Sequence, residues 1–182
     1  MAYYPVLMID HERQIGDIAR QIGFTQISLS SYLSPTIRAL HRGNSAVVDA
    51  YLSPVLRAYV DGFNSHFVGK QAGERTDFMK SDGGLVAADR CVIWCSSSGP
   101  DQTDMPRFSG LRALLSGPAG GFVGCAKTAY SPSRQRPVVG FDMGGTSTDV
   151  SRFAGSFDLA FETTIAGVNI ACPQLSIETV AA

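Results

Sequence analysis

The apolar residues of this chain recur first at helical and then at strand spacing. Ile15, Ile18 and Ile22 follow a helical period, which predicts a helix over Glu12–Gln21 with Gly23 as its C-terminal stop. Thr25–Leu29 then alternates apolar and polar residues, a pattern that predicts a strand. A helix followed by a strand is a unit of an α/β layer. The opening of the chain therefore predicts an α/β fold.

The same periods predict further elements along the rest of the chain. A long helix is expected over Ser45–Phe67, where Pro54 should kink it or begin its second part. Its apolar side would carry Val48, Leu52, Val55, Leu56 and Tyr59. A short strand at Asp77–Met79 leads into a turn, and a helix is expected over Pro118–Tyr130. A mixed sheet is completed by strands at Val138–Asp142, Val150–Phe153, Asp158–Thr163 and Val168–Ala171.

The segment with the clearest chemical content is Pro137–Val150, PVVGFDMGGTSTDV. A buried strand ends at Asp142, and Gly144 and Gly145 allow the chain to reverse and bring backbone N–H groups against a ligand. Hydroxyl donors follow at Thr146, Ser147 and Thr148, and Asp149 adds a second carboxylate that suits Mg²⁺. This composition fits a cradle for a metal-bound phosphate. It also fits an ordinary tight hairpin, because Gly and Asp are common turn residues.

Two other segments add candidate ligand contacts. A helix is predicted to begin at Ser116, Gly117, Pro118, Gly120 and Gly121, and its free N–H groups would donate hydrogen bonds to an anion. The same small residues would also serve close packing of the helix on a sheet. The turn Ser81–Gly84, with the sequence Ser81, Asp82, Gly83, Gly84, would hold substrate or a metal-bound water, or form a capped turn.

Composition narrows the functional class. The formal net charge of −1 gives no indication of a basic face for nucleic acid. No apolar run reaches the roughly 18–20 residues of a membrane span. The 4 cysteines are irregularly spaced, which suits a reducing compartment better than a disulfide framework. We therefore expect a cytosolic protein that binds neither nucleic acid nor membrane.

The three motifs SDGG, LSGPAGG and DMGGTSTDV occur in the order found in a known family. Together with HERQIGDIARQIGF, RGNSAVVDAYLSPVLRAYV and the final TVAA, they resemble the ATP-dependent 5-oxoprolinase and hydantoinase A family, and most closely its eukaryotic 5-oxoprolinases. The resemblance covers nearly the whole chain. It implies an actin- and hexokinase-like (ribonuclease H-like) ATPase fold, incomplete here, and the use of ATP to open a cyclic amide such as 5-oxoproline.

The resemblance also implies a role for each motif. Asp142 would hold phosphate oxygens through Mg²⁺, and Thr148 and Asp149 would support the turn or orient water, which makes these three the catalytic candidates. ATP would be bound by Gly144, Gly145, Thr146, Ser147, Ser116, Gly117, Gly120, Gly121, Ser81, Asp82, Gly83 and Gly84. The expected partners are a 5-oxoproline-like substrate, the remainder of the enzyme chain and, at full length, a second copy in a homodimer.

The chain departs from the family pattern within Cys91–Arg107, which adds roughly 17 residues of loop composition and which we expect to be an insertion, real or a gene-model artefact. We expect residues 1–75 to be the end of an N-terminal hydantoinase/oxoprolinase domain with its linking helix. Residues 76–182 would begin the hydantoinase A/oxoprolinase domain. Since family members carry another phosphate motif before this region, the chain alone is expected to be inactive. The alternatives are a truncated, non-catalytic product and a hydantoinase-type enzyme with another cyclic amide.

Overall fold

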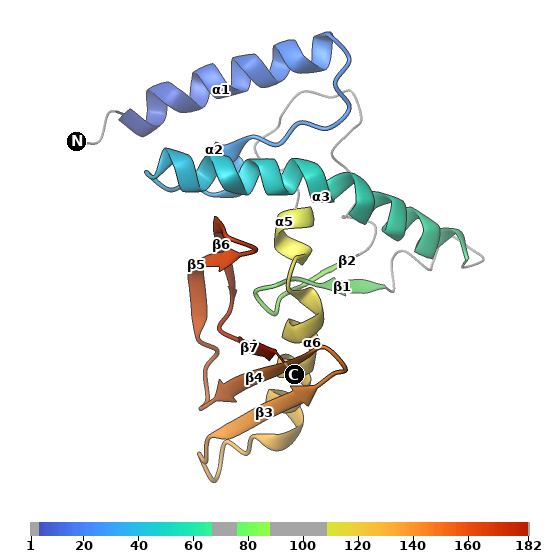
Figure 1. The fold of residues 1–182 in the computed structure, drawn as a ribbon, viewed down its shortest axis with the longest axis vertical. Helices are drawn as coiled ribbons and strands as arrows, with labels where there is room; N and C mark the ends of the chain where they lie inside the picture. The colour runs from blue at the N-terminus through green and yellow to red at the C-terminus, as the bar shows by residue number, and fades with distance from the viewer. Residues whose placement is uncertain (1–3, 67–75, 88–108, 182) are drawn as a thin grey trace. The chain divides into compact units, whose positions relative to one another are not determined.

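A computed structural model describes residues 4–66, 76–87 and 109–181 of the chain (Figure 1). The expected insertion at Cys91–Arg107 lies outside these residues. The helices are α1 (Tyr4–Gln21), α2 (Ser30–Leu33), α3 (Ala39–Ser65), α5 (Gly110–Ala113) and α6 (Ser116–Ala129). The strands are β1 (Asp77–Met79), β2 (Leu85–Ala87), β3 (Val138–Met143), β4 (Ser147–Phe153), β5 (Leu159–Ile165), β6 (Val168–Leu175) and β7 (Glu178–Ala181). Among the described helices, none has both the length and the apolarity that a membrane span needs.

The chain divides into two compact units. The first contains residues 1–76, 87–111 and 162–172, and the second contains residues 77–86, 112–161 and 173–182. The division into residues 1–75 and 76–182 that the sequence suggests stays a prediction. The assignment of the two parts to named family domains stays a prediction.

In the first unit, α1 ends where the sequence predicts. Gly23 takes a positive φ of 99°, a left-handed conformation that glycine adopts without strain, and its N–H donates to the carbonyl of Arg20. The helix begins at Tyr4, well before the predicted start at Glu12. Its predicted apolar stripe is exposed: Ile15, Ile18 and Ile22 are 66%, 56% and 69% accessible.

The predicted strand at Thr25–Leu29 is wrong. This segment is irregular and leads into α2. The Gln26 side chain donates to the Ser28 hydroxyl at 2.9 Å, and that hydroxyl donates to Asp49 at 2.7 Å. Polar side chains here bond to one another and to α3, so they fix the segment without a strand partner.

Helix α3 turns a small polar face toward its neighbours. Ser45, Asp49 and Ser53 follow one another at helical spacing and are all buried. Asp49 accepts the N–H of Leu111 at 3.1 Å, and Ser53 accepts that of Gly110 at 2.9 Å. Of the predicted apolar side, Val55 and Tyr59 are exposed. The helical period therefore predicted the existence of α3, but the helix begins at Ala39 and not at Ser45, and its buried face was not identified.

The second unit packs α6 against one face of the β3–β4–β7 sheet (Figure 1). Ala119 and Phe122 of α6 form a core with Leu175, and Met79, Val123, Phe153, Phe157 and Ile177 pack around it. Phe122 and Phe157 meet edge to face with ring centroids 5.3 Å apart. This core fixes α6 relative to the strands that carry the predicted site.

The predicted mixed sheet is replaced by three small sheets among the described residues. These are β1–β2, β3–β4–β7 and β5–β6. The pairs β3–β4 and β4–β7 are antiparallel. Strands β3 to β6 lie near the positions that strand propensity predicts. Propensity depends on nearby residues, however, and does not specify which strands pair with each other.

Candidate functional site

The DMGGTSTDV motif forms the hairpin of β3 and β4. Asp142 pairs with Asp149 and Met143 pairs with Thr148 in the antiparallel register. The Gly144 N–H donates to the Ser147 carbonyl at 2.9 Å. Two residues, Gly145 and Thr146, therefore form the tip of the hairpin, one residue later than the reversal predicted at Gly144 and Gly145.

Asp142 and Asp149 lie on the same face of this hairpin. Residues directly opposite in an antiparallel pair share a face, with Cβ atoms about 4.5–5.5 Å apart. Asp149 accepts a hydrogen bond from the Thr179 hydroxyl at 2.7 Å. Asp142 is exposed and has no hydrogen-bond or ion-pair partner among the described residues. Like charges in this arrangement repel each other, so the pair is suited to sharing a cation.

The structure does not bring Thr148 together with these carboxylates. Thr148 precedes Asp149 on β4 and stands opposite Met143, so its side chain points to the other face of the sheet. It is 8% exposed. Thr148 is therefore a buried sheet residue on the face opposite the carboxylates, and its role in supporting the turn or orienting water stays a prediction.

Helix α6 lies against the face that carries the two carboxylates. A Cβ added at Gly121 would lie 3.6 Å from Asp142 Oδ2, and one added at Gly140 would lie 3.4 Å from Cys125 Sγ of α6. Leu115 precedes the helix and no side chain caps its N-terminus within the described residues. The first N–H groups of a helix have no acceptor inside the helix, and Pro118 has no N–H. The open N-terminus of α6 and the carboxylate face thus belong to one structural unit.

The glycines of the SGPAGG and DMGG motifs are not required by steric contacts among the described residues. An added Cβ at Gly117, Gly120 or Gly145 would meet nothing within 4 Å, and at Gly144 only the Ser147 carbonyl at 3.4 Å. Neither Gly144 nor Gly145 lies in the left-handed region. Space that is left open by missing side chains, beside open N–H groups, is what a bound phosphate requires.

The SDGG turn differs, because Gly83 is required by its backbone conformation and by its contacts within the chain. Gly83 has a φ of 80°, and an added Cβ would lie 3.1 Å from Leu175 and Val123. At Gly84 it would lie 2.9 Å from Lys80 Cε. Lys80 is a flexible side chain that can move aside, so the close packing of the turn on α6 depends on Gly83.

The polar side chains of the SDGG turn are also occupied within the chain. Asp82 accepts the Gly84 N–H through Oδ1 at 2.8 Å, and its Oδ2 lies 3.0 Å from Lys80 Nζ. Ser81 is 2% exposed and its hydroxyl contacts Arg112 and Leu115. Of the two interpretations of this motif, the structure favours the capped turn.

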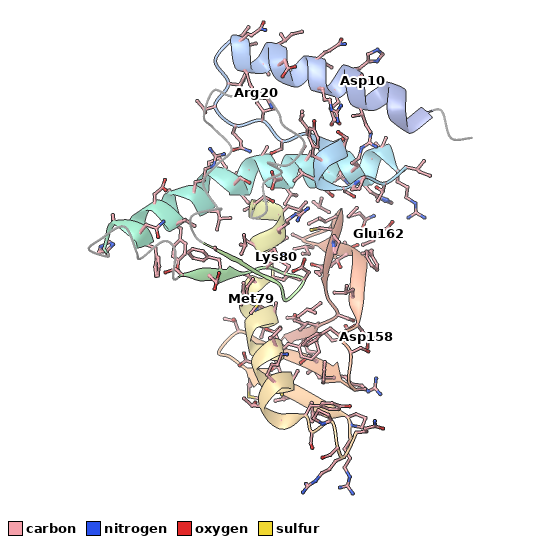
Figure 2. The ribbon with its side chains drawn as sticks, turned by 180° about the vertical axis from the view of Figure 1, so that it is seen from behind. Asp10, Arg20, Met79, Lys80, Asp158 and Glu162 are labelled. Carbon is pink, nitrogen blue, oxygen red and sulfur yellow. The ribbon has the colours of Figure 1, made fainter. Side chains whose placement is uncertain are left out.

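Sequence reasoning did not identify three residues that border the predicted site. Lys80, labelled in Figure 2 at the end of β1, folds over Gly84 and pairs with Asp82. Thr179 reaches Asp149 only because β7 pairs with β4. Arg112 is half-buried, and its guanidinium has no partner among the described residues. Lys80 could have been found from its position directly before SDGG, whereas the other two depend on tertiary structure.

The donor set fits Mg²⁺ in its usual protein environment. Mg²⁺ is commonly held by one or two carboxylates, with phosphate oxygens and water completing its octahedron. Asp142 and Asp149 supply that number. No cluster of three or more His, Cys, Asp or Glu side chains occurs in the described part of the chain, so a closed protein cage for a metal is not formed there.

The model of the family described as Hydantoinase/oxoprolinase matches residues 42–103 and 92–182. The chain belongs to the hydantoinase/oxoprolinase family. It is 49% identical over 176 residues to the 5-oxoprolinase of Saccharomyces cerevisiae, a match that covers 95% of this chain and 12% of that protein. It is 46% identical over 172 residues to 5-oxoprolinase 1 of Arabidopsis thaliana, covering 94% of this chain and 12% of that protein.

This hydantoinase/oxoprolinase chain also resembles a solved structure. The nucleotide-free structure of acetone carboxylase, an enzyme of ATP-dependent acetone carboxylation, superposes with a TM-score of 0.67 at 20% sequence identity. The match covers 95% of this chain and 23% of the acetone carboxylase chain. The fold is thus part of the actin- and hexokinase-type ATPase fold, as the sequence predicts.

Proposed function

We propose that this chain is a section of an ATP-dependent 5-oxoprolinase. The reaction converts 5-oxo-L-proline, ATP and water into L-glutamate, ADP and phosphate. The 49% identity to the yeast 5-oxoprolinase supports this substrate, while 12% coverage of that protein means that most of the enzyme would come from other residues.

The observation that carries the proposal is the position of Asp142 beside Gly121, in the second turn of α6. An anionic phosphate group would be met by N–H groups from the helix N-terminus on one side and by the carboxylate pair, through a cation, on the other. Mg²⁺ bound there would neutralise phosphate charge. The residues that would hold it are Asp142 and Asp149, and the Thr179 hydroxyl would keep Asp149 oriented.

The chemistry of the substrate explains why ATP is needed. An unstrained amide is a poor electrophile, and transfer of a phosphoryl group to its oxygen makes the carbonyl carbon open to attack by water. In this proposal the open glycines at Gly117, Gly120 and Gly145 leave room for the phosphates. The SDGG turn contributes by holding α6 in place.

The experiment that tests the proposal is a phosphate-release assay on the complete enzyme that carries this chain. ATP is supplied with 5-oxoproline, hydantoin or acetone in separate reactions. We expect phosphate release to depend on 5-oxoproline. Equal release with every compound, or without any, would contradict the oxoprolinase assignment while leaving an ATPase.

Two further parts of the proposal are the location of the protein in the cell and the origin of the segment Cys91–Arg107. We propose a cytosolic location, which the irregular spacing of the 4 cysteines of the chain supports. We also propose that Cys91–Arg107 is an insertion, because the two stretches matched by the family model overlap within this segment.

A further inference from the structure

Ser81 is the most completely hydrogen-bonded polar residue at the predicted site. Its hydroxyl donates to the Arg112 carbonyl at 2.8 Å and accepts the Leu115 N–H at 2.9 Å. Its own N–H also donates to the Arg112 carbonyl at 2.7 Å, and its carbonyl accepts the Leu175 N–H at 2.8 Å. With 2% of its surface exposed, the side chain has no room to contact a ligand.

These bonds act on the segment that enters α6. Arg112 lies in α5, residues 114 and 115 join α5 to α6, and Leu115 stands immediately before the first helical residue, Ser116. No side chain caps this end of α6 among the described residues, so the hydrogen bond to the Leu115 N–H is the contact that fixes its entry. The direction of the first N–H groups of the helix therefore depends on the Ser81 hydroxyl.

We propose that Ser81 is a positioning residue for nucleotide phosphate, acting through Arg112 and Leu115 and never touching the ligand. This inference rests on the proposed function, because it requires a phosphate at the start of α6. It replaces the direct ATP contact expected for Ser81 from the sequence. Loss of the hydroxyl leaves the Leu115 N–H without its partner and lets the entry to α6 move.

Ser45 provides a matched control. It is 0% exposed, and its hydroxyl also bridges two backbone groups, donating to the His41 carbonyl at 2.8 Å and accepting the Ala171 N–H at 2.9 Å. Ser45→Ala removes the same kind of buried bridge in the other compact unit. A general loss of stability should affect both variants, whereas misplacement of the phosphate site should affect only Ser81→Ala.

The test compares the complete enzyme with its Ser81→Ala, Ser81→Cys and Ser45→Ala variants. Initial rates are measured against Mg-ATP at saturating 5-oxoproline, and amide hydrogen exchange is followed at residues 113–119. Ser81→Cys keeps nearly the same volume with a poor donor and acceptor, so it serves if Ser81→Ala does not fold. Thermal unfolding measures the shared loss of stability.

We expect both Ser81 variants to raise the KM for ATP on the order of tenfold, which corresponds to the loss of a hydrogen bond that aligns the site. They should also speed amide exchange at the start of α6, while Ser45→Ala changes neither quantity. An unchanged KM in active Ser81 variants would overturn this inference alone. Absence of 5-oxoproline-dependent phosphate release from the unmodified enzyme would contradict the proposed function, and this inference with it.

Discussion

Asp142 is an exposed carboxylate that lies directly opposite the Asp149 carboxylate. Because of this arrangement, we expect substitution of Asp142 to stabilise the fold and to lower the activity. Asp142→Asn removes a repulsion between like charges, which should raise the free energy of unfolding in the absence of Mg²⁺ by about 0.2–1 kcal/mol. In the complete enzyme the same change should lower kcat by at least about 100-fold, because charge stabilisation of the phosphoryl group is lost. Steady-state kinetics and thermal unfolding with and without Mg²⁺ measure both effects.

Asp158→Asn is the matched control for this prediction. Asp158, labelled in Figure 2, is an exposed aspartate of the same unit whose position precedes β5. Its substitution should leave kcat and the Mg²⁺ dependence of unfolding unchanged. If Asp142→Asn keeps a normal kcat, the hairpin is only structural.

At the level of elements, α6 contains glycines that weaken it as a helix. Gly121 and Gly124 are both exposed, and an added Cβ would meet only Asp142 Oδ2 at 3.6 Å in the first case and nothing within 4 Å in the second. Alanine at either position should therefore raise the free energy of unfolding by about 0.5–1 kcal/mol. Only Gly121→Ala should raise the KM for ATP, since its methyl group lies beside the Asp142 carboxylate.

Parallel measurement of unfolding and of KM in the two α6 variants tests this prediction. Gly124→Ala controls for the stiffening of the helix. If the KM for ATP rises equally in both variants, the cause is the rigidity of the helix. If the KM changes in neither variant, the nucleotide does not use the space beside Gly121.

The attachment of α1 to α2 depends on one carboxylate. Glu12 accepts the N–H of Ser30 at 2.6 Å and that of Ser31 at 3.0 Å. Burial raises the pKa of Glu12, but the hydrogen bonds from Ser30 and Ser31 outweigh it and hold the pKa below its usual value of 4.5. The stabilisation is therefore complete above about pH 4.5 and is lost as the pH falls through the lowered pKa of the folded state.

We expect this loss to appear as faster amide exchange at Ser30 and Ser31 in acid. Glu12→Gln cannot ionise, so the acid-dependent part of the protection should vanish, with a loss of about 1 kcal/mol of local stability at neutral pH. Comparison of the two proteins at each pH removes the intrinsic pH dependence of exchange. Equal protection of both proteins at neutral pH would contradict the role of Glu12.

At the scale of the whole molecule, the 182-residue chain exposes apolar surface beside its predicted site. Val139, Phe141 and Met143 project from β3 on the face away from α6 and are 64%, 64% and 69% exposed. Alone, the chain should self-associate through this exposed apolar surface. Its Kd for Mg-ATP should be about 1 mM or weaker, because the residues that close around the nucleotide would come from the rest of the enzyme. Calorimetric titration, light scattering and phosphate release measure these properties. Steady turnover by the 182-residue chain would show that its site is complete.

The sequence alone determined those elements that depend on residues close together in the chain. Helix α6, the end of α1 at Gly23 and the β3–β4 hairpin with its tip at Gly145 all follow from periodicity and turn chemistry within a few residues. The motifs were likewise sufficient to indicate the family. Each of these features is specified by residues that are close together in the sequence.

Only the tertiary structure decided which side of each element is used. The sequence grouped Thr148 with Asp142 and Asp149, but the register places Thr148 on the opposite face. It treated the glycines of SDGG and DMGG alike, although Gly83 is required by its φ and its contacts while Gly145 faces open space. The reason is physical: a strand's register and a glycine's neighbours are set by segments distant in the sequence, and a shift of one residue exchanges the two faces of a strand.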